Sequence, residues 1–362
     1  MPFDIKEIGE VSDFGDLKTE WSALLNELPH ISFFLTWEWL NTWWHTYSTP
    51  RDQLRIITIK KNQKLVAIFP LYVQNRQTIR FIGTGEKEAD EAATEYLDII
   101  CSKKLAPDVC ALLYKHFQGS KLTFIFNNYL EESTLEKYIA TLSTSHWENT
   151  ATCGISYRAK LDNTLQKFTS QCSKSLIKRL NRAQKKFHNE LNGKIESYNT
   201  AETLSKGFDT LKKLHKTRWL SKDEKGVFVS EKFLTFHNKF TQQAITNNWL
   251  KLEIMYANDI AISAVYCLQY QGSCYFYQSG VQDDFKPNIS PGYLMHLIQI
   301  ESAIKKELLY YDYMKGSIDN SYKAKLSNDK RYMYNTTLIK KSCKNTLTKV
   351  KWQIKQLRDA LI

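Results

Sequence analysis

The sequence lacks the features that mark membrane-spanning, secreted and disulfide-bonded proteins. No window approaches the roughly 18 consecutive apolar residues that a membrane span needs. The first residues do not combine a basic start with an apolar core, so we expect no secretory signal. The seven cysteines are an odd number and include no C-x-x-C pair, which favours reduced thiols and a cytoplasmic location.

Several catalytic signatures are also missing. The chain has no G-x-S-x-G or H-E-x-x-H motif and no Cys/His cluster with zinc-like spacing. We therefore expect neither a serine nucleophile of that type nor a metal site. Residues 83–86, Gly-Thr-Gly-Glu, lack the lysine and the spacing of a phosphate loop.

The sequence does contain ample apolar material and a surplus of positive charge. The 362 residues are 43% hydrophobic and 13% aromatic, which is enough for two domains with packed cores. The net charge of +12 favours anionic partners in general: nucleotides, coenzyme A, acidic glycans, nucleic acid or anionic lipid. Charge alone does not choose among them.

Two stretches of the chain align without gaps, at residues 54–74 and 250–270. Each is a strand rich in β-branched residues, a turn at Asn62 or Asn258, and a longer apolar strand. A further turn and a third strand come next in both halves, and helical sequence precedes each. Any two hairpins share some of these traits, but the matching flanks favour a tandem duplication of one α/β unit.

The two halves diverge after the third strand. Beyond Gly280, the second half has Ser290, Pro291 and Gly292, which suit the N-cap and first turn of a helix predicted to run to about Leu308. A glycine there leaves backbone N–H groups and the positive end of the helix dipole free for a phosphate. We expect a cofactor only in this half, and the element order favours a coenzyme A-type acyltransferase over a nucleotide hydrolase.

Two other helices carry unusual charge. Over residues 173–192 an apolar stripe is accompanied by lysines and arginines at helical spacing, including Lys178 and Arg182. Like charges this close weaken a helix unless an anion answers them, so a solvated face and an anion-binding helix are both open. Residues 343–362 are predicted to form a basic amphipathic helix, for which docking on the protein itself is favoured over membrane or partner contact.

With these motifs in view, the chain resembles the acetyltransferase-like family of the cellulose-biosynthesis protein CelD, a branch of the GNAT acyltransferases related to the FemAB peptidoglycan transferases. The resemblance covers nearly the whole chain. Its sharpest parts are the basic helix at 174–182, His-Lys-Thr-Arg-Trp at 215–219, Ser-Pro-Gly at 290–292, Asp-Tyr-Met-Lys-Gly at 312–316, and Tyr-Lys at 322–323.

The resemblance implies an α/β fold of tandem GNAT-like domains, with mixed central sheets flanked by helices. We place an N-terminal domain without cofactor at 1–155, a C-terminal domain with the donor site at 156–342, and the basic helix at 343–362. It further implies acyl transfer to an amine, with acyl-coenzyme A as donor, or aminoacyl-tRNA by analogy with FemAB. One departure is Lys315, where the family often has arginine, because lysine offers a point charge instead of a bidentate grip.

Amide formation from a thioester needs an unprotonated amine, a stabilised oxyanion and a protonated or tolerated thiolate. The predicted site residues divide among these tasks and the binding of two substrates. Each also has a structural alternative, such as a core-edge ion pair for Arg218 or a turn-forming carboxylate for Asp312. The predicted catalytic residues are Asp312, Tyr322 and Lys323; the predicted donor-binding residues are Gly280, Ser290, Gly292 and Tyr293; the predicted acceptor-binding residues are Arg218, Trp219, Lys178 and Arg182.

These expectations combine into one leading hypothesis and two alternatives. The leading one is N-acyl transfer, acetyl transfer first, from acetyl-CoA or another acyl-CoA to an amine of a sugar, sugar nucleotide or cell-envelope precursor, by direct attack in a ternary complex. The first alternative uses aminoacyl-tRNA as donor. The second is a non-catalytic GNAT-fold scaffold for polysaccharide synthesis.

Overall fold

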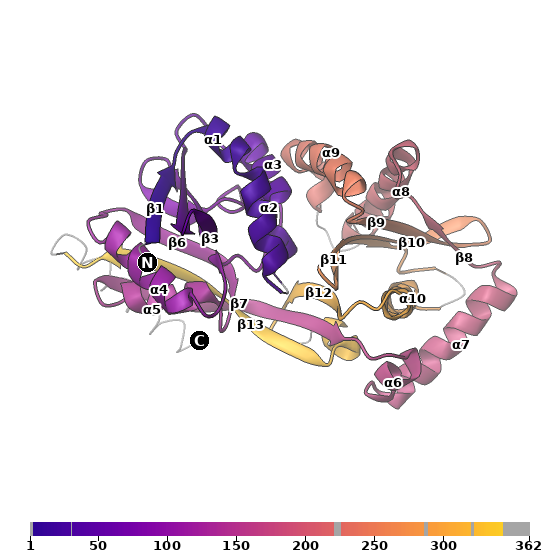
Figure 1. Cartoon of the computed structure of the whole chain (residues 1–362). Coiled ribbons are helices and arrows are strands. Elements are labelled where there is room, and N and C mark those ends of the chain that lie inside the picture. The colour runs from indigo at the N-terminus through magenta and orange to yellow at the C-terminus, as the bar shows by residue number, and fades with distance from the viewer. Residues whose placement is uncertain (1–2, 30, 221–225, 286–288, 320–321, 343–362) are drawn as a thin grey trace. The chain divides into compact units, whose positions relative to one another are not determined.

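The computed structural model describes residues 3–29, 31–220, 226–285, 289–319 and 322–342 (Figure 1). The predicted helix at 343–362 lies outside the described residues. Two compact units divide the chain: unit 1 comprises residues 1–86, 92–153 and 332–362, and unit 2 comprises residues 87–91 and 154–331. Among the described residues, no helix is both long and apolar enough to cross a bilayer.

Unit 1 is a mixed sheet with helices on both faces. Its strands are β1 (Phe3–Ile8), β2 (Gln53–Lys61), β3 (Lys64–Gln74), β4 (Thr78–Phe81), β5 (Ile100–Cys101), β6 (Thr123–Leu130), the start of β7 (His146–Lys160) and most of β13 (Asp329–Lys340). Figure 1 shows α1 (Val11–Asp16), α2 (Lys18–Glu27) and α3 (Trp37–Tyr47) on one side and α4 (Ala106–Phe117) and α5 (Thr134–Leu142) on the other.

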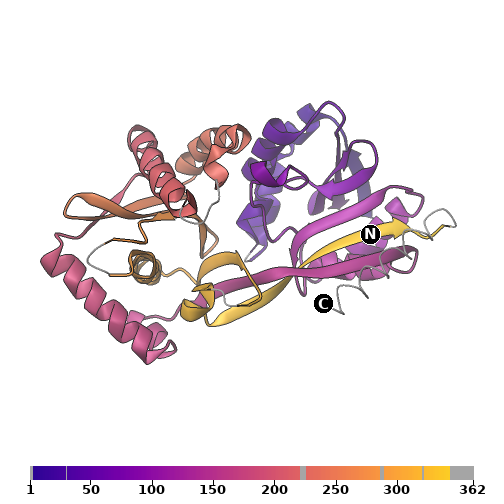
Figure 2. The same ribbon diagram turned by 180° about the vertical axis from the view of Figure 1, so that it is seen from behind.

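Unit 2 repeats this plan. Its strands are the end of β7, β8 (Lys194–Ser197), β9 (Leu250–Ala257), β10 (Ile260–Tyr270), β11 (Ser273–Val281) and β12 (Tyr310–Gly316), in the order β7-β12-β11-β10-β9-β8. One face carries α8 (Ala201–Leu220) and α9 (Glu231–Thr246); the other carries α6 (Leu165–Ser170), α7 (Lys174–Glu190) and α10 (Pro291–Lys305). Figure 2 shows the same layers from behind.

The two predicted hairpins are confirmed, and they show why the sequence marks them so clearly. Asn62 and Asn258 begin two-residue turns at φ of 53° and 48°, a region that asparagine tolerates better than most residues. In both units the third strand then pairs in parallel with the strand that follows a helix: β4 with β6, and β11 with β12. This shared topology agrees with the duplication predicted from the sequence.

The apolar stretch that ends at residue 101 is mostly not a strand. Within residues 94–101, only Ile100–Cys101 pairs as a strand. Tyr96 has a φ of 58° because its N–H donates to the carbonyl of Asn128 in β6, 2.8 Å away. A tertiary hydrogen bond therefore overrides the local β propensity.

The last strand of unit 1 comes from the far end of the chain. In β13, residues 333–338 pair antiparallel with β6, in the register Met333 to Leu130 through Leu338 to Phe124. The end of β7 pairs with β12 of unit 2, Tyr310 opposite Lys160. The sequence-based boundary after residue 155 differs from this arrangement, because it assigns β13 to the second domain.

Candidate functional site

Unit 2 contains a cavity of about 320 Å³ where two parallel strands part. Strands β11 and β12 pair only from Ser273–Tyr310 to Tyr275–Asp312. Beyond this point β12 has a register irregularity and Met314 adopts a φ of 61°. The next residues of β11, Phe276, Ser279 and Val281, line the cavity. The space therefore exists because the two strands stop sharing hydrogen bonds.

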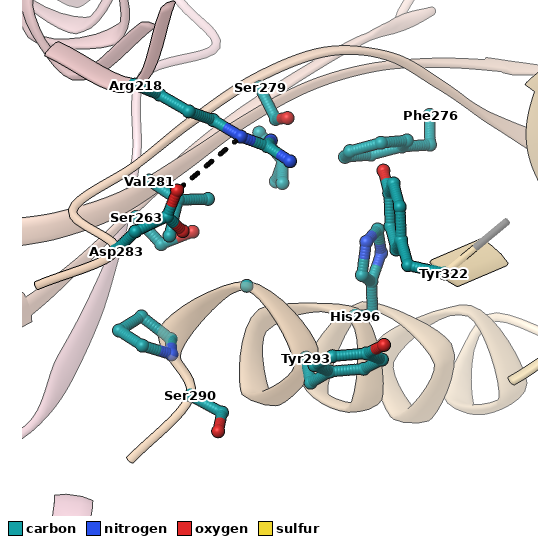
Figure 3. Close-up of a pocket in the computed structure, with 13 residues that line it drawn as sticks. Arg218, Ser263, Phe276, Ser279, Val281, Asp283, Ser290, Tyr293, His296 and Tyr322 are labelled. Carbon is teal, nitrogen blue, oxygen red and sulfur yellow. Dashed lines mark ion pairs between the residues drawn. The ribbon is translucent and has the colours of Figure 1, made fainter. Parts of the chain in front are cut away.

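The start of α10 forms one wall of the cavity, with Ser290, Pro291, Gly292 and Tyr293 (Figure 3). Ser290 is the N-cap, as predicted, but its φ of 50° is left-handed and its side chain makes no capping hydrogen bond. Because Pro291 has no N–H, Gly292 and Tyr293 present the first backbone donors of the helix. The helix dipole adds positive potential at this point, which suits an anionic ligand.

Arg218 brings a positive charge to the cavity from α8. Its Nε lies 3.9 Å from an Asp283 carboxylate oxygen, as the dashed line in Figure 3 shows, and Asp283 is largely exposed. An ion pair of this length and exposure contributes little to stability. The Arg218 guanidinium also lies beside the Tyr322 hydroxyl and acts to lower the pKa of that group.

Tyr322 reaches the same cavity from η4 (Tyr322–Leu326). Burial raises the pKa of its hydroxyl, although Arg218 beside it acts in the opposite direction. The group therefore stays protonated near neutral pH and can donate a hydrogen bond or a proton.

His296 lies one helical turn after Gly292 and also lines the cavity. Its Nδ1 is 3.0 Å from the Tyr311 hydroxyl, and its ring centroid is 4.5 Å from that of Phe276. Burial lowers the pKa of His296 to about 3, so the imidazole is neutral at working pH. The sequence reasoning missed it; the available signal was a histidine in an otherwise apolar helix stripe.

Ser263 of β10 is the second lining residue that the sequence reasoning missed. It is fully buried, and its hydroxyl finds no hydrogen-bond partner within the described part of the chain. Ser263 pairs with Val281, whose side chain lies about 3.5 Å from where a β-carbon on Gly292 would stand. A buried hydroxyl without a partner is costly, and a ligand at the helix start would supply one.

Two predicted catalytic residues are engaged elsewhere. The Asp312 carboxylate is buried, accepts the N–H of Met314 at 2.7 Å and pairs with Arg331 at 3.3 Å. The ammonium of Lys323 donates to the carbonyls of Tyr313 and Lys315, 2.6 and 2.5 Å away. Neither side chain lines the cavity. Their bonds are those of residues that hold the bulged end of β12.

Gly280 and Trp219 do not line the cavity either. A β-carbon on Gly280 would stand 2.5 Å from the His215 backbone nitrogen, so this glycine permits β11 and α8 to approach each other. The Trp219 ring packs against His215, with centroids 5.7 Å apart. Both residues shape the neighbourhood of Arg218 without reaching the ligand space.

Of the predicted residues, the structure gathers Arg218, Ser290, Gly292, Tyr293 and Tyr322 around one cavity. Lys178 and Arg182 line a different groove, between α6 and α7. No group of three or more potential metal-ligating side chains occurs among the described residues.

In unit 1, residues 94–96 are hydrogen-bonded to β6, the strand that pairs in parallel with β4. Tyr96 is buried and donates its N–H to Asn128 of β6, while the side-chain amide of Asn128 donates to the Thr94 carbonyl at 3.3 Å. These bonds hold residues 94–96 against the strand that corresponds to β12 of unit 2.

The comparisons with known proteins agree with this geometry. Residues 174–324, which lie within unit 2, match the model of the family described as Acetyltransferase (GNAT) domain. This match supports an acyltransferase as the class of protein. No curated protein matches the chain.

Solved structures show the same fold over nearly the whole chain. FemX has 10% identity and a TM-score of 0.59, covering 91% of this chain and 96% of its own. L-PGS from Bacillus licheniformis has 13% identity and a TM-score of 0.52, covering 95% and 98%. The C-terminal domain of a putative lysylphosphatidylglycerol synthetase from Agrobacterium fabrum has 8% identity and a TM-score of 0.53, covering 92% and 95%. At these identities the likeness concerns the fold, which is a mixed α/β sheet of the GNAT type.

Proposed function

We propose that this chain is an N-acyltransferase that moves an acyl group, acetyl in the first instance, from acyl-coenzyme A to an amine of a sugar, sugar nucleotide or cell-envelope precursor. The observation that carries the proposal is the cavity at the divergence of β11 and β12, where a helix start and an unpartnered buried serine face one space. A CelD-like branch and a cytoplasmic location belong to the same proposal.

The anionic part of the donor would lie at the start of α10. Gly292 and Tyr293 supply backbone N–H groups there, and Ser263 supplies a hydroxyl. Two further cations flank the Tyr293 ring, since Arg179 and Lys325 each lie 5.7 Å from its centroid. Together with Arg218 they would neutralise a diphosphate. Unit 1, whose equivalent place holds residues 94–96, would bind no donor.

The chemistry would be direct. The acceptor nitrogen bonds to the acyl carbon, the carbon–sulfur bond breaks, the amine loses a proton and the leaving thiolate gains one. Tyr322 is positioned as the proton donor to sulfur, because its hydroxyl is protonated and faces the cavity. His296 is neutral, and since no described residue bonds to its Nε2, this atom could form a hydrogen bond to a substrate. Asp312 and Lys323 take no part in this scheme, because both are bound elsewhere.

Calorimetric titration with acetyl-coenzyme A tests the donor site. Gly292→Glu would place a carboxylate beside the phosphates, whereas Gly292→Ala adds only a methyl group that has ordinary contact distance to Val281, 3.5 Å. We expect binding by the wild type and the alanine variant and its loss in the glutamate variant. Absence of binding in the wild type would contradict the proposal.

The two alternative functions predict different results in the same titration. If aminoacyl-tRNA is the donor, the protein binds tRNA in a salt-sensitive manner and ignores acetyl-coenzyme A. If the chain is a scaffold, neither donor binds. An acceptor screen among amino sugars is informative only after acetyl-coenzyme A binding has been found.

A further inference from the structure

A second concave surface lies in unit 2, between α6 and α7. Figure 1 labels these two helices. This α6–α7 groove has a volume of about 540 Å³. Its walls carry four cations, four neutral hydrogen-bonding side chains and one apolar residue: Lys174, Lys178, Arg182, Lys185, Gln166, Thr169, Ser170, Asn181 and Ile177. It shares none of its lining residues with the cavity at α10.

The positive charge of α7 is uncompensated within the described residues. The helix carries six lysines and arginines, and its first acidic residue is Glu190, at the very end. None of the six makes an ion pair with a described residue. Lys174 stands in the first turn, where a cation opposes the helix dipole. Repulsion between these charges destabilises the free helix, so stability does not explain their arrangement.

The cations of the groove are regularly spaced. Lys174, Lys178 and Arg182 follow each other at four-residue steps, which is roughly 6 Å along a helix axis. The buried positions Leu176, Leu180 and Phe187 fix the opposite face of α7 against the core. The groove therefore offers one positive charge per helical turn along a fixed line, which matches an extended chain with evenly spaced negative charges.

The groove also lacks the side chains by which proteins bind single-stranded nucleic acids or membranes. No aromatic side chain is among its lining residues, and single-stranded nucleic acids are held largely by stacking of bases on aromatic rings. Only Ile177 could enter a bilayer, whereas interfacial helices insert an apolar face. Lysines, which predominate here, bind phosphate as point charges, and an arginine fork binds phosphate as well as carboxylate.

We propose that the α6–α7 groove binds a base-free phosphodiester chain, such as a polyol phosphate polymer. The phosphates would pair with Lys174, Lys178, Arg182 and Lys185, and the hydroxyl groups of the polyol with the amide and hydroxyl side chains beside them. This binding is independent of the acyl transfer proposed for the cavity at α10, and its test uses no turnover.

The test is titration of the full chain with a synthetic glycerol phosphate oligomer long enough to span the four cations. We compare the wild type with the double variant Lys178→Gln/Arg182→Gln. The matched control is Lys213→Gln/Lys216→Gln, which removes the same charge from exposed positions on α8, on the other face of the sheet. We expect the groove variant to lose at least roughly tenfold in affinity at low salt, with a salt slope smaller by about two.

One observation and one measurement guard against trivial loss of fold. All four substituted side chains are exposed or nearly so, and the groove variant should melt at a slightly higher temperature because repulsion along α7 is relieved. Equal loss in both double variants would overturn the proposal, because the effect would then follow net charge alone. So would tighter groove-dependent binding of poly(U) RNA, of polygalacturonate or of anionic vesicles, or no binding of the oligomer at all.

Discussion

The buried carboxylate of Asp312 lies 3.3 Å from the guanidinium of Arg331, whose side chain is 25% exposed. This pair joins β12 to β13, and Asp312 also accepts the N–H of Met314. We expect Asp312→Asn to lower the free energy of unfolding by roughly 3 kcal/mol, because it leaves the arginine without its counter-charge. Urea denaturation measures this loss.

Acetyl-coenzyme A binding should survive in the Asp312 variant below its unfolding transition. Arg331→Met provides the reciprocal measurement and should destabilise the protein by a similar amount. If an Asp312 variant keeps full stability but has no turnover, Asp312 is a catalytic residue and this interpretation is wrong.

Gly292, which lines the cavity, and Gly280, which does not, should respond differently to alanine. A β-carbon on Gly280 meets the His215 backbone nitrogen at 2.5 Å, whereas one on Gly292 meets only the Val281 side chain, at 3.5 Å. Gly280→Ala should cost roughly 1–3 kcal/mol of stability through overpacking, and Gly292→Ala should cost little. Thermal unfolding of the pair compares them directly, and equal melting temperatures would contradict this description of the Gly280 contact.

Tyr322→Phe separates binding from chemistry in the proposed reaction. Loss of the hydroxyl should lower kcat by roughly a hundredfold, which is typical of a general acid, while the affinity for acetyl-coenzyme A changes little. Because burial raises the pKa of Tyr322, kcat should not fall through tyrosine ionisation between pH 7 and about 9. Tyr332→Phe, at an exposed tyrosine of β13, is the control. Unchanged kcat in the Tyr322 variant would remove it from the mechanism.

Acid should destabilise unit 2 through its buried histidines. Burial lowers the pKa of both His237 and His296 to about 3. Between that value and about 6.5 the unfolded chain binds a proton at each site and the native protein does not, so stability falls as the pH falls. The loss is roughly 2 kcal/mol per histidine from pH 6.5 to 5. Denaturation midpoints at pH 7, 6 and 5 measure it.

His237→Gln isolates one contribution to that pH dependence. The ring of His237 lies between the hydroxyls of Tyr266 and Tyr277, at 3.2 and 3.0 Å, so the variant should be less stable at pH 7. It should nevertheless lose less stability than the wild type between pH 7 and pH 5. Parallel pH curves for the two proteins would show that this histidine titrates normally in the folded state.

The unit 1 sheet should not form from residues 1–155 alone. Without β13, strand β6 presents an unpaired edge and the Tyr129 hydroxyl loses its bond to Thr336, 2.7 Å long. Exposed edges promote association. We expect the 1–155 fragment to aggregate and a fusion that adds residues 332–342 to be more soluble, as judged by size-exclusion chromatography. A monomeric, folded 1–155 fragment would show that β13 is dispensable.

The hairpins and the α10 start could be predicted because their signals are local. Asn62 and Asn258 tolerate the left-handed conformation that their turns require, and Pro291 suits the first position of a helix. The basic stripe of α7 was equally visible, since helical spacing is a property of the sequence. These features do not depend on which distant segments pack together.

The remainder of the candidate site depends on contacts between distant residues. Lys323 was predicted to be catalytic, but its ammonium donates to carbonyls at the bulged end of β12. No sequence pattern predicts this bulge. Gly280 was assigned to the donor, yet its role is set by α8, some sixty residues earlier in the chain. Ser263 and His296 matter only because strand divergence opens a space beside them.

The late return of β13 to unit 1 has a consequence for synthesis on the ribosome. Residues 154–331 belong to the other unit or to the connection into it, so they are made before the strand that completes the first sheet. At roughly 5–20 residues per second, that interval lasts on the order of 10–35 s. During this time the edge of β6 that later pairs with β13 is unpaired. Chaperones or rapid completion of the chain would keep this edge from pairing with a strand of another molecule.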